Sequence, residues 1–420
     1  MHLVIFEGSQ WKSLAPLSLC RPTFSLLCGA STLLEKQIRF LSPTRLTLWV
    51  RPELADHCRT HIVPFLSALK LARAVSVNEP LDEEPAVLID GSSLYLAAPS
   101  FPSDSSGFVA ADATNSAVRE ARVTAPGLSA EDALRESPRW KALLDLPRTA
   151  PIGSPAIHLW DLLRANEEAL RVDARDWQGK RTPPADGLFY LINKDHVLIE
   201  HGVKLGPGCV IDASNGPVML SGKCTIGANA VVQGPCFIGA NAEIAPLSLI
   251  RPGTSIGPWC KIGGEVARAT VLGYSNKAHE GFLGDSYLGE WINLGAGTNT
   301  SNLKNTYGSI GMHLGGEEIN TGRQFLGSII GDHTKTAIGT RFMSGSYVGY
   351  CSMIATSAHA PRFTPSFSFL TDSGNEPYRL EKAFEVARAV FARRGLAWID
   401  LDEELMRYAE GAAKSVERDS

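Results

Sequence analysis

The chain has 420 residues, of which 44% are apolar and 20% charged, and its formal net charge is -4. This composition is typical of a folded protein, and the charge gives no reason to expect nucleic acid or an anionic membrane as a partner. The start, MHLVIFEG, has neither the basic residues nor the long apolar stretch of a signal peptide. No stretch reaches the roughly 18 apolar residues of a membrane span, so we expect a soluble, cytoplasmic protein. The eight cysteines form no Cys-x-x-Cys pair, and we expect them to be reduced and mostly buried.

The first hundred residues read as strands alternating with helices. Apolar strands are expected at residues 2–6, 45–50 and 85–90, and a helix at 32–40. This alternation is typical of a parallel, doubly wound α/β sheet, in which ligands bind beyond the carboxyl ends of the strands. Asp90, at the end of the third strand, is therefore a candidate site residue.

From Ile199 onward, aliphatic residues return at every sixth position. Ile199, Leu205 and Ile211 are six apart. After a three-residue insertion the same step continues through Leu220, Ile226, Val232, Ile238, Ile244, Ile250, Ile256 and Ile262. Neither a helix nor an alternating strand has this period, whereas a hexapeptide period indicates a parallel β-helix. Each inward aliphatic contributes roughly 1.5–3 kcal/mol, so the register is strongly specified.

The hexad frame changes after Ile262. Phe282, Leu288 and Leu294 are again six apart but in another register, so we expect a loop or insertion between residues 263 and 281. Weaker hexads return at Phe342, Val348 and Ile354.

Helices are predicted on both sides of the β-helix. Residues 157–172 fit an amphipathic helix, followed by a polar linker at 178–186. Residues 378–395 fit a helix with Arg393 and Arg394 in its last turn, which we expect to cover the end of the last coil. The predicted domains are an α/β domain with its linker helix at 1–185, a β-helix at 186–375 and a helical cap at 376–420.

The segment KAHEGFLGDSYLGEWINLGAGTNTSN, residues 277–302, is more specific than the hexads. It resembles the acetyltransferase domain of the bifunctional uridylyltransferase/acetyltransferase family that makes UDP-N-acetylglucosamine, in its divergent branch. The resemblance covers residues 195–310 well, and 1–100 and 320–395 loosely. It implies an amino-terminal nucleotidyltransferase-like domain and a homotrimer of left-handed β-helices, with acetyl transfer between neighbouring subunits.

The reaction that the resemblance implies is acetyl transfer from acetyl-CoA to the amine of glucosamine-1-phosphate. A protonated amine cannot attack a thioester, so a base must take a proton, and imidazole suits this task at neutral pH. His279 occupies the position of the family's catalytic base. The alternative for His279 is an ordinary surface or packing histidine.

The resemblance also implies binding residues around His279. Arg251 would bind the sugar phosphate, Asn293 would orient the sugar, and Asn302 would contact acetyl-CoA. Backbone amides near Ala296 would stabilise the tetrahedral intermediate. The three side chains have plainer alternatives. Arg251 could be a solvated corner residue, and Asn293 and Asn302 could be turn or ladder asparagines.

The same region holds two lysines that could bind phosphate and two positions that differ from the family pattern. Lys277 and Lys304 are expected to attract substrate phosphates. Phe282 stands where the family usually has Tyr, so one contact to the sugar is in question. Leu303 replaces a common Tyr beside Asn302.

For uridylyl transfer, the amino-terminal half needs a phosphate-binding loop and an acidic residue for Mg²⁺. The usual Gly-rich loop ending in Arg is absent. By resemblance to the divergent branch, Arg21 and Lys36 are candidate nucleotide ligands, and Asp90 is the candidate Mg²⁺ ligand. Asp90 could equally be an ordinary Asp-Gly turn residue.

Three hypotheses remain at this point. The first is an enzyme with both activities, which would use glucosamine-1-phosphate, acetyl-CoA and UTP. The second is a sugar-1-phosphate nucleotidylyltransferase whose β-helix is only structural or regulatory. The third is a structural assembly protein in which both sites have decayed. The retention of His279, Asn293 and the GAGT corner favours the first.

Overall fold

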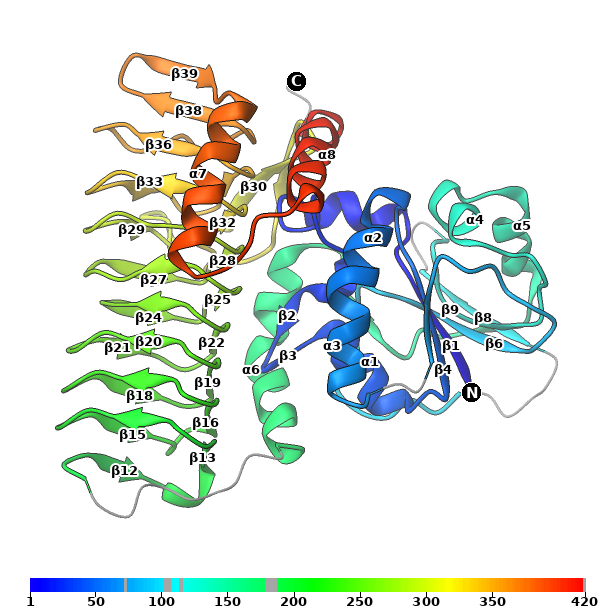
Figure 1. Cartoon of the computed structure of the whole chain (residues 1–420), viewed down its shortest axis with the longest axis horizontal. Coiled ribbons are helices and arrows are strands. Elements are labelled where there is room, and N and C mark those ends of the chain that lie inside the picture. The colour runs from blue at the N-terminus through cyan, green and yellow to red at the C-terminus, as the bar shows by residue number, and fades with distance from the viewer. Residues whose placement is uncertain (72–73, 102–106, 113–115, 178–186, 418–420) are drawn as a thin grey trace. The chain divides into compact units, whose positions relative to one another are not determined.

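A computed structural model describes residues 1–71, 74–101, 107–112, 116–177 and 187–417, which form two compact units (Figure 1). The first unit comprises Met1–Leu14, Cys20–Leu26 and Ser31–His158, and the second comprises Ala15–Leu19, Leu27–Ala30 and Leu159–Ser420. The linker expected at 178–186 lies outside the described residues.

The first unit is built on a seven-stranded sheet. In spatial order the strands are β10 (Arg148–Thr149), β8 (Phe108–Ala111), β9 (Val118–Val123), β6 (Ala86–Asp90), β1 (His2–Phe6), β4 (Arg45–Trp49) and β5 (Val75–Val77). β1 pairs in parallel with both β4 and β6, as the sequence predicted, whereas β9 runs antiparallel to β6 and β8. Strands β1 and β6 are buried along their whole length, so their apolar runs form the centre of the sheet.

Helices connect and flank these strands. They are α1 (Leu33–Leu41), α2 (Ala55–His57), α3 (Val63–Ala68), α4 (Ala130–Arg135) and α5 (Pro138–Lys141), with short turns η1 (Ser9–Leu14), η2 (Thr23–Ser25), η3 (Pro52–Leu54), η4 (Cys58–Ile62) and η5 (Ala142–Asp145). The short strands β3 (Ser31–Thr32), β7 (Ser93–Leu94) and β11 (Ser154–Pro155) complete the unit. Helix α1 begins at a capping box in which Thr32 and Glu35 satisfy each other's backbone N–H.

The second unit is a left-handed parallel β-helix with three faces (Figure 1). The first face holds β12 (Tyr190–Ile192), β15 (Val210–Asp212), β18 (Val231–Gln233), β21 (Leu249–Ile250), β24 (Glu265–Ala267) and β27 (Phe282–Gly284). The second holds β13 (Val197–Ile199), β16 (Val218–Leu220), β19 (Cys236–Ile238), β22 (Thr254–Ile256), β25 (Thr270–Val271), β28 (Tyr287–Leu288), β32 (Ser328–Ile330), β35 (Ser346–Val348) and β37 (Phe363–Thr364).

The third face begins with β14 (Lys204–Leu205), β17 (Thr225–Ile226), β20 (Glu243–Ile244), β23 (Lys261–Ile262) and β26 (Asn276–Lys277). It continues through single bridges, Asn276 to Asn293 and Asn293 to Lys335, into β33 (Lys335–Thr336), β36 (Met353–Ala355), β38 (Ser368–Thr371) and β39 (Gly374–Pro377). The pair β29 (Asn299–Thr300) and β34 (Arg341–Phe342) lies in the later coils.

The predicted hexad aliphatics form the interior of the prism. All of them from Ile211 to Ile262 belong to one buried cluster, and Leu205 packs against it partly buried. The later hexads Phe342, Val348 and Ile354 belong to the same cluster. The hexapeptide interpretation is therefore confirmed.

The frame change after Ile262 is a shortened coil, so the expected insertion at residues 263–281 was wrong. Ile244 pairs with Ile262, eighteen residues later, whereas Ile262 pairs with Lys277, only fifteen residues later. Leu283 points into the core and Phe282 lies beside it, only partly buried. The hexad frame predicted Phe282, and not Leu283, as the residue that points into the core.

The insertion lies one coil later. Leu288 pairs with Ile330, forty-two residues further on, instead of the usual eighteen. The inserted segment contains an antiparallel hairpin, β30 (Gly311–Leu314) with β31 (Glu317–Asn320). Arg362 ties this hairpin to the coil through an ion pair with Glu318 at 2.8 Å.

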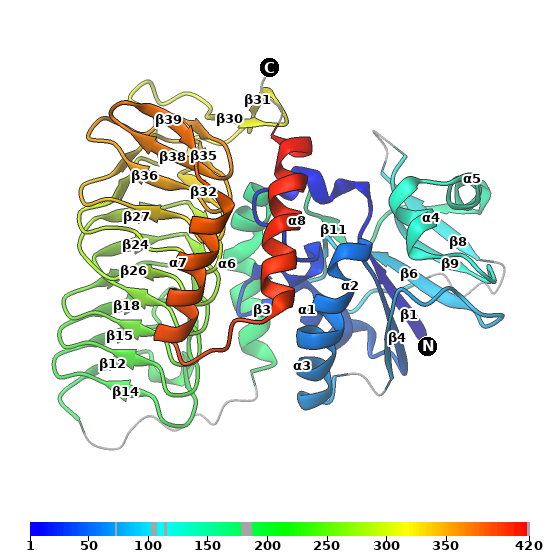
Figure 2. The same cartoon turned by 45° about the horizontal axis from the view of Figure 1, so that its top comes forward.

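Three helices accompany the β-helix: α6 (Leu159–Arg175), α7 (Leu380–Arg393) and α8 (Asp400–Val416), with the short strand β2 (Leu27–Cys28) and turn η6 (Lys194–His196). Leu170 of α6 packs on Leu198, Met219 and Phe237, which point outward from the second face. Helix α7 lies along the side of the coil in both views (Figure 2), whereas we had expected it at the end of the coil.

Two further observations concern the chain as a whole. Seven of the eight cysteines are buried, Cys20 is partly buried, and all are free thiols, as expected. Within the described part of the chain, the search for a helix with the length and apolarity needed to cross a membrane finds none.

Candidate functional site

His279 lies on the edge where the third face turns into the first, between β26 and β27, and its side chain is exposed. Its backbone carbonyl accepts a hydrogen bond of 2.9 Å from Nζ of Lys277. The next corner stacks on this one, because the amide of Gly297 donates to the carbonyl of Glu280 at 3.3 Å. The imidazole therefore projects from a corner whose backbone is fixed on both sides.

Lys277 takes the inward position that Ile226, Ile244 and Ile262 occupy in the preceding coils. It is only 2% exposed, and its Nζ also donates to the carbonyl of Gly263 at 2.6 Å. Burial lowers the pKa of this lysine to about 8, although nearby Glu280 acts in the opposite direction. The expectation that Lys277 attracts substrate phosphates is corrected, because its ammonium lies inside the prism and binds two corner carbonyls.

The outer side of the first face carries Arg251 and Phe282. Arg251 follows β21 and forms an ion pair of 3.0 Å with Glu265 of β24, with both side chains well exposed. Glu265 pairs in register with Phe282 of β27, whose amide donates to the side chain of Asn299 at 2.8 Å. Arg251 and Phe282 are thus on one face, with Glu265 between them.

Asn293 and Ala296 lie in the coil above His279. Asn293 is exposed on the third face, and its Oδ1 accepts a bond of 3.4 Å from Nδ2 of Asn276. The carbonyl of Ala296 accepts from the amide of Gly339 at 2.7 Å. No acceptor for the Ala296 amide is found within the described residues, so this N–H remains a candidate donor to a ligand at the edge.

Asn302 and Lys304 have other partners. The side-chain amide of Asn302 donates to Asp285 at 2.6 Å, and Asp285 is also bound twice by Arg268 at 2.7 Å. Lys304 donates to the carbonyl of Ser309 at 2.7 Å within the inserted segment. Of the predicted residues, Lys277 contacts His279 directly, through the backbone carbonyl of the histidine. The ammonium groups of Lys277 and Lys304 are used by backbone carbonyls.

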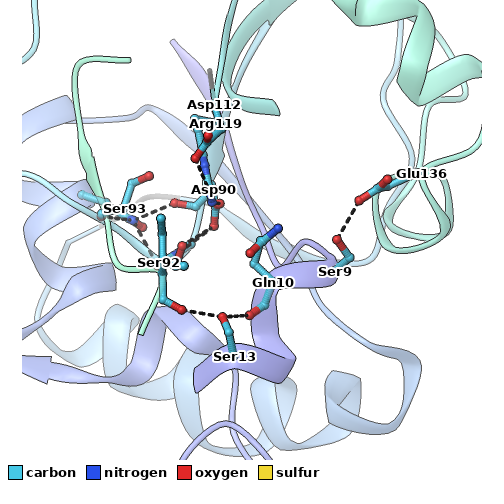
Figure 3. Close-up of polar contacts among 12 residues, drawn as sticks. Ser9, Gln10, Ser13, Asp90, Ser92, Ser93, Asp112, Arg119 and Glu136 are labelled. Atoms are coloured by element: carbon cyan, nitrogen blue, oxygen red, sulfur yellow. Dashed lines mark hydrogen bonds and ion pairs between the residues drawn. The ribbon is translucent and has the colours of Figure 1, made fainter. Parts of the chain in front are cut away.

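A second candidate site is a cavity of about 190 Å³ in the first unit. It lies beyond the carboxyl ends of β1 and β6, where the doubly wound fold predicts a ligand. Its lining includes Gly8, Ser9 and Gln10 directly after β1, and Asp90 at the end of β6. Ser9 donates to Glu136 at 2.6 Å across this cavity (Figure 3).

Asp90 is buried, and both of its oxygens have partners (Figure 3). One oxygen accepts from the amide and the hydroxyl of Ser92 at 2.8 and 2.9 Å, and the other forms an ion pair with Arg119. The same guanidinium contacts Asp112 at 3.3 Å. Within the described residues there is no cluster of three or more His, Cys, Asp or Glu that could hold a metal. The Asp90 carboxylate is already bound by Ser92 and Arg119, so a Mg²⁺ ion at this position would have to displace the guanidinium.

Arg21 and Lys36 do not line this cavity. Arg21 is buried, and its carbonyl accepts a bond of 3.2 Å from Arg51. Lys36 is fully buried and its Nζ donates to the hydroxyl of Ser31 at 2.7 Å. Their positions give no support to the expected nucleotide contacts.

Apart from Asp90, the sequence reasoning assigned no role to the residues that line this cavity, among them Ser9, Glu136 and Lys141. The position of Ser9, three residues after the first strand, was a usable signal, since the phosphate-binding loop of such domains follows that strand. No sequence signal marked Glu136 or Lys141, because they come from the region of α4 and α5, far away in the chain.

Comparisons with known proteins show similarity to sugar nucleotidyltransferases and to bifunctional relatives. Residues 3–182 match the family model described as sugar nucleotidyl transferase. A bifunctional sugar-1-phosphate nucleotidylyltransferase/acetyltransferase of Sulfurisphaera tokodaii is 34% identical over 106 residues, which are 25% of this chain and 26% of that protein. The bifunctional protein GlmU of Methanococcus aeolicus is 30% identical over 203 residues, 48% of this chain and 42% of that protein.

The matched segments span less than half the length of these curated relatives. A solved UDP-N-acetylglucosamine acyltransferase aligns over 57% of this chain and 94% of its own at 16% identity, with a TM-score of 0.24, too low to support an argument. The amino-terminal part of the chain thus matches the sugar nucleotidyltransferase family, and the resemblance to the bifunctional sugar-1-phosphate nucleotidylyltransferase/acetyltransferases is confirmed at modest identity.

Proposed function

We propose that the chain acts in UDP-N-acetylglucosamine biosynthesis, with acetyl transfer from acetyl-CoA to glucosamine-1-phosphate on the β-helix. The observation that carries this proposal is the exposed imidazole of His279 on a fixed corner, with Asn293 and the amide of Ala296 in the next coil. A rigid scaffold that presents one exposed base beside hydrogen-bonding groups suits acyl transfer. The bifunctional relatives support the same reaction.

In this mechanism, the sugar amine attacks the thioester carbon while His279 accepts the proton that the amine loses. The carbonyl oxygen gains negative charge, which the N–H of Ala296 stabilises. The C–S bond then breaks, and the CoA thiolate leaves and is protonated. Asn293 would orient the sugar, and Arg251 would bind the sugar phosphate. To do so, Arg251 must release its ion pair with the exposed Glu265.

The proposal extends to uridylyl transfer from UTP to the acetylated sugar-1-phosphate in the first unit. Its support is the family match over residues 3–182 and the cavity beyond β1 and β6. The exposed Lys141 at the cavity is the candidate phosphate ligand. Asp90 takes no part in metal binding in this scheme, since Arg119 already neutralises it.

The proposal also includes a homotrimer of the β-helix. Leu247 and Ile338 lie on the same edge of the prism as His279 and are 78% and 82% exposed. Large exposed aliphatic groups on the surface of a folded protein are typical of an interface. Sedimentation equilibrium should give a trimer for the wild type and a smaller species for the double variant Leu247→Asp/Ile338→Asp. A wild-type monomer would reject this part.

The acetyl transfer is tested by release of free CoA from acetyl-CoA with glucosamine-1-phosphate as acceptor. His279→Ala should lower kcat by about 10²–10⁴-fold, the usual contribution of a general base. The matched control is His201→Ala, because His201 is also exposed on the coil but lies near its beginning. Unchanged turnover in His279→Ala would remove this base, and no wild-type turnover would favour the nucleotidylyltransferase with a structural β-helix.

The uridylyl transfer is tested by release of pyrophosphate from UTP with N-acetylglucosamine-1-phosphate. Lys141→Ala should raise KM for UTP about tenfold, because a cation on a phosphate is lost. Lys12→Ala is the control, since Lys12 is exposed near the same loop but does not line the cavity. Equal effects of the two variants would reject the assignment of Lys141.

A further inference from the structure

The β-helix carries a second concave feature, a cleft of about 380 Å³ on its third face beside the end of α7. Its floor comes from β23, β26 and β33 and from the bridge at Asn293, and its wall comes from Val390, Arg393 and Arg394 of the helix. None of the predictions from sequence assigned a role to Arg393 and Arg394.

An aromatic ladder holds α7 against the coil at this point. Tyr274 and Trp291 occupy equivalent corners of successive coils and stack with ring centroids 4.3 Å apart. Phe391 of α7 stacks on the other side of Trp291, also at 4.3 Å. Such aromatic pairs add roughly 0.5–1.5 kcal/mol beyond the burial of their area. The end of the helix, and with it Arg393 and Arg394, is therefore fixed over the third face.

The cleft is strongly cationic. Lys261, Lys335, Arg393 and Arg394 line it, and none of the described residues in its lining carries a carboxylate. Lys261 reaches out to Glu243 at 3.0 Å, but both of these side chains are about half exposed, so this pair is weak. Arg393 is exposed at the rim and has no ion pair among the described residues.

The other two cations are held in place by polar groups. Nζ of Lys335 donates to the carbonyls of Trp291 and His333 at 2.7 and 2.9 Å. Arg394 donates to Oδ1 of Asn276 at 3.0 Å, and Asn276 in turn donates to Asn293. The ammonium of Lys335 is thus used by backbone carbonyls, as that of Lys277 is. Lys261, Arg393 and Arg394 remain as the cations of the lining that a ligand can meet.

We propose that this cleft binds the phosphate groups of a substrate of the β-helix. Three such cations around one small cleft exceed what a single carboxylate needs, whereas a phosphate monoester or diphosphate carries enough charge and acceptor oxygens to engage several of them. A ligand placed here lies close to the candidate catalytic edge. Asn276 precedes His279 by three residues, which corresponds to about 10 Å of extended chain.

The identity of the ligand rests on the proposed function, in which two substrates of the β-helix carry phosphate groups. One is the acyl donor, whose CoA moiety carries a diphosphate, and the other is the sugar phosphate. Arg251, the expected ligand of the sugar phosphate, lies on the first face and does not line this cleft. Both molecules would offer phosphate oxygens to the cleft, and the experiment below distinguishes which of them binds there.

The experiment is calorimetric titration of the full chain with pyrophosphate, CoA and glucosamine-1-phosphate at low ionic strength. In Arg393→Gln/Arg394→Gln, affinity for pyrophosphate and for at least one of the other two should fall about tenfold or more. Weakening of CoA alone assigns the cleft to the acyl donor, and weakening of glucosamine-1-phosphate alone assigns it to the acceptor. Wild-type affinity in the double variant, or no binding of any phosphate to the wild type, overturns the proposal.

Two further variants test whether the double variant acts by disturbing α7 rather than by removing charge. Lys261→Gln changes the rigid coil instead of α7 and should weaken the same ligand about threefold. Arg379→Gln, at the other end of α7 and exposed, should bind all three ligands as the wild type does. Equal losses in Arg379→Gln and the double variant would also overturn the proposal. Since His279→Ala should lose turnover but keep phosphate binding, failure of the acetyl-transfer assignment is distinguishable from failure of the cleft.

Discussion

The two candidate sites of this chain differ in how their charged groups are used. At the coil edge, His279 is exposed, and a hydrogen bond from Lys277 fixes its backbone. Among the described residues, its imidazole ring makes no hydrogen bond. In the amino-terminal cavity, Asp90 and Arg119 are buried and bind each other. An ion pair that is already satisfied contributes to the fold, whereas an exposed group on a fixed backbone can meet a substrate.

The difference follows from the scaffolds. A β-helix satisfies its backbone hydrogen bonds between coils, so its edges can present side chains without opening the structure. The central strands β1 and β6 of the first unit are covered on both faces, and a carboxylate at their ends must find a partner when buried. The four predictions below test this contrast, from the largest expected effect to the smallest.

Arg119→Met should cause the largest loss of stability. It leaves the buried carboxylate of Asp90 without its cation, which costs about 3–5 kcal/mol in the free energy of unfolding. Urea denaturation measures this loss. Arg122→Met, on the same strand but only partly buried, should change stability by about 0.5 kcal/mol or less. If the two variants are equally stable, the pair does not stabilise the first unit.

Ile226→Ala should destabilise the β-helix by about 2–5 kcal/mol, because it leaves a cavity in a fully buried ladder. The control is Ile192→Ala, since Ile192 is 45% exposed at the start of the coil. Thermal unfolding should show a clear drop in Tm for the first variant only. A similar, small change in both would mean that the hexad register contributes little.

Lys277→Met should alter the pH dependence of stability. The folded pKa is about 8 and the unfolded value 10.5, so protonating this lysine costs the folded state free energy. The cost is fully present below pH 8 and disappears as the pH rises to 10.5, and its size is on the order of 3 kcal/mol. The stability of the variant relative to the wild type should therefore fall by that amount between pH 7.5 and 10.5.

The measurement for Lys277→Met is the free energy of unfolding at both pH values. Lys204→Met, whose lysine is exposed on the same face, should show a constant difference from the wild type. A constant difference for Lys277→Met as well would mean that its ammonium is not disfavoured by burial.

Arg251→Met should have the smallest effect on stability, within about 1 kcal/mol, since its ion pair with Glu265 is exposed. If Arg251 binds the sugar phosphate, KM for glucosamine-1-phosphate should rise about tenfold with kcat little changed. Urea denaturation and steady-state CoA release measure the two quantities separately. An unchanged KM would leave Arg251 as a corner residue.

The fold of the second unit could be predicted from the sequence, because one side chain in every six must point inward to fill the core of the β-helix. The period persists wherever coils have eighteen residues, as from Ile244 to Ile262. It failed at the fifteen-residue coil, where the frame predicted Phe282 inside and the structure places Leu283 there. A shortened coil removes residues from corners without leaving a signal in the period itself.

The candidate site was only partly predictable. His279, Asn293 and Ala296 were singled out because a specific motif surrounds them, and their roles stay predictions. The buried position of Lys277 was not predicted, because a lysine at an inward position contradicts the usual preference for apolar residues there. The phosphate cleft was also missed, since it joins coil residues such as Lys261 and Asn276 to Arg393 and Arg394, which are more than a hundred residues further along the chain.

By itself, the sequence determined the hexapeptide β-helix and the parallel centre of the amino-terminal sheet, and it singled out His279 as the candidate base, because periodicity and motifs are local properties. Only the tertiary structure decided which ionisable groups are paired. Asp90 meets Arg119 across antiparallel strands, and Arg394 meets Asn276 across the third face. Such pairs depend on the distance between segments remote in the chain, which local patterns do not encode.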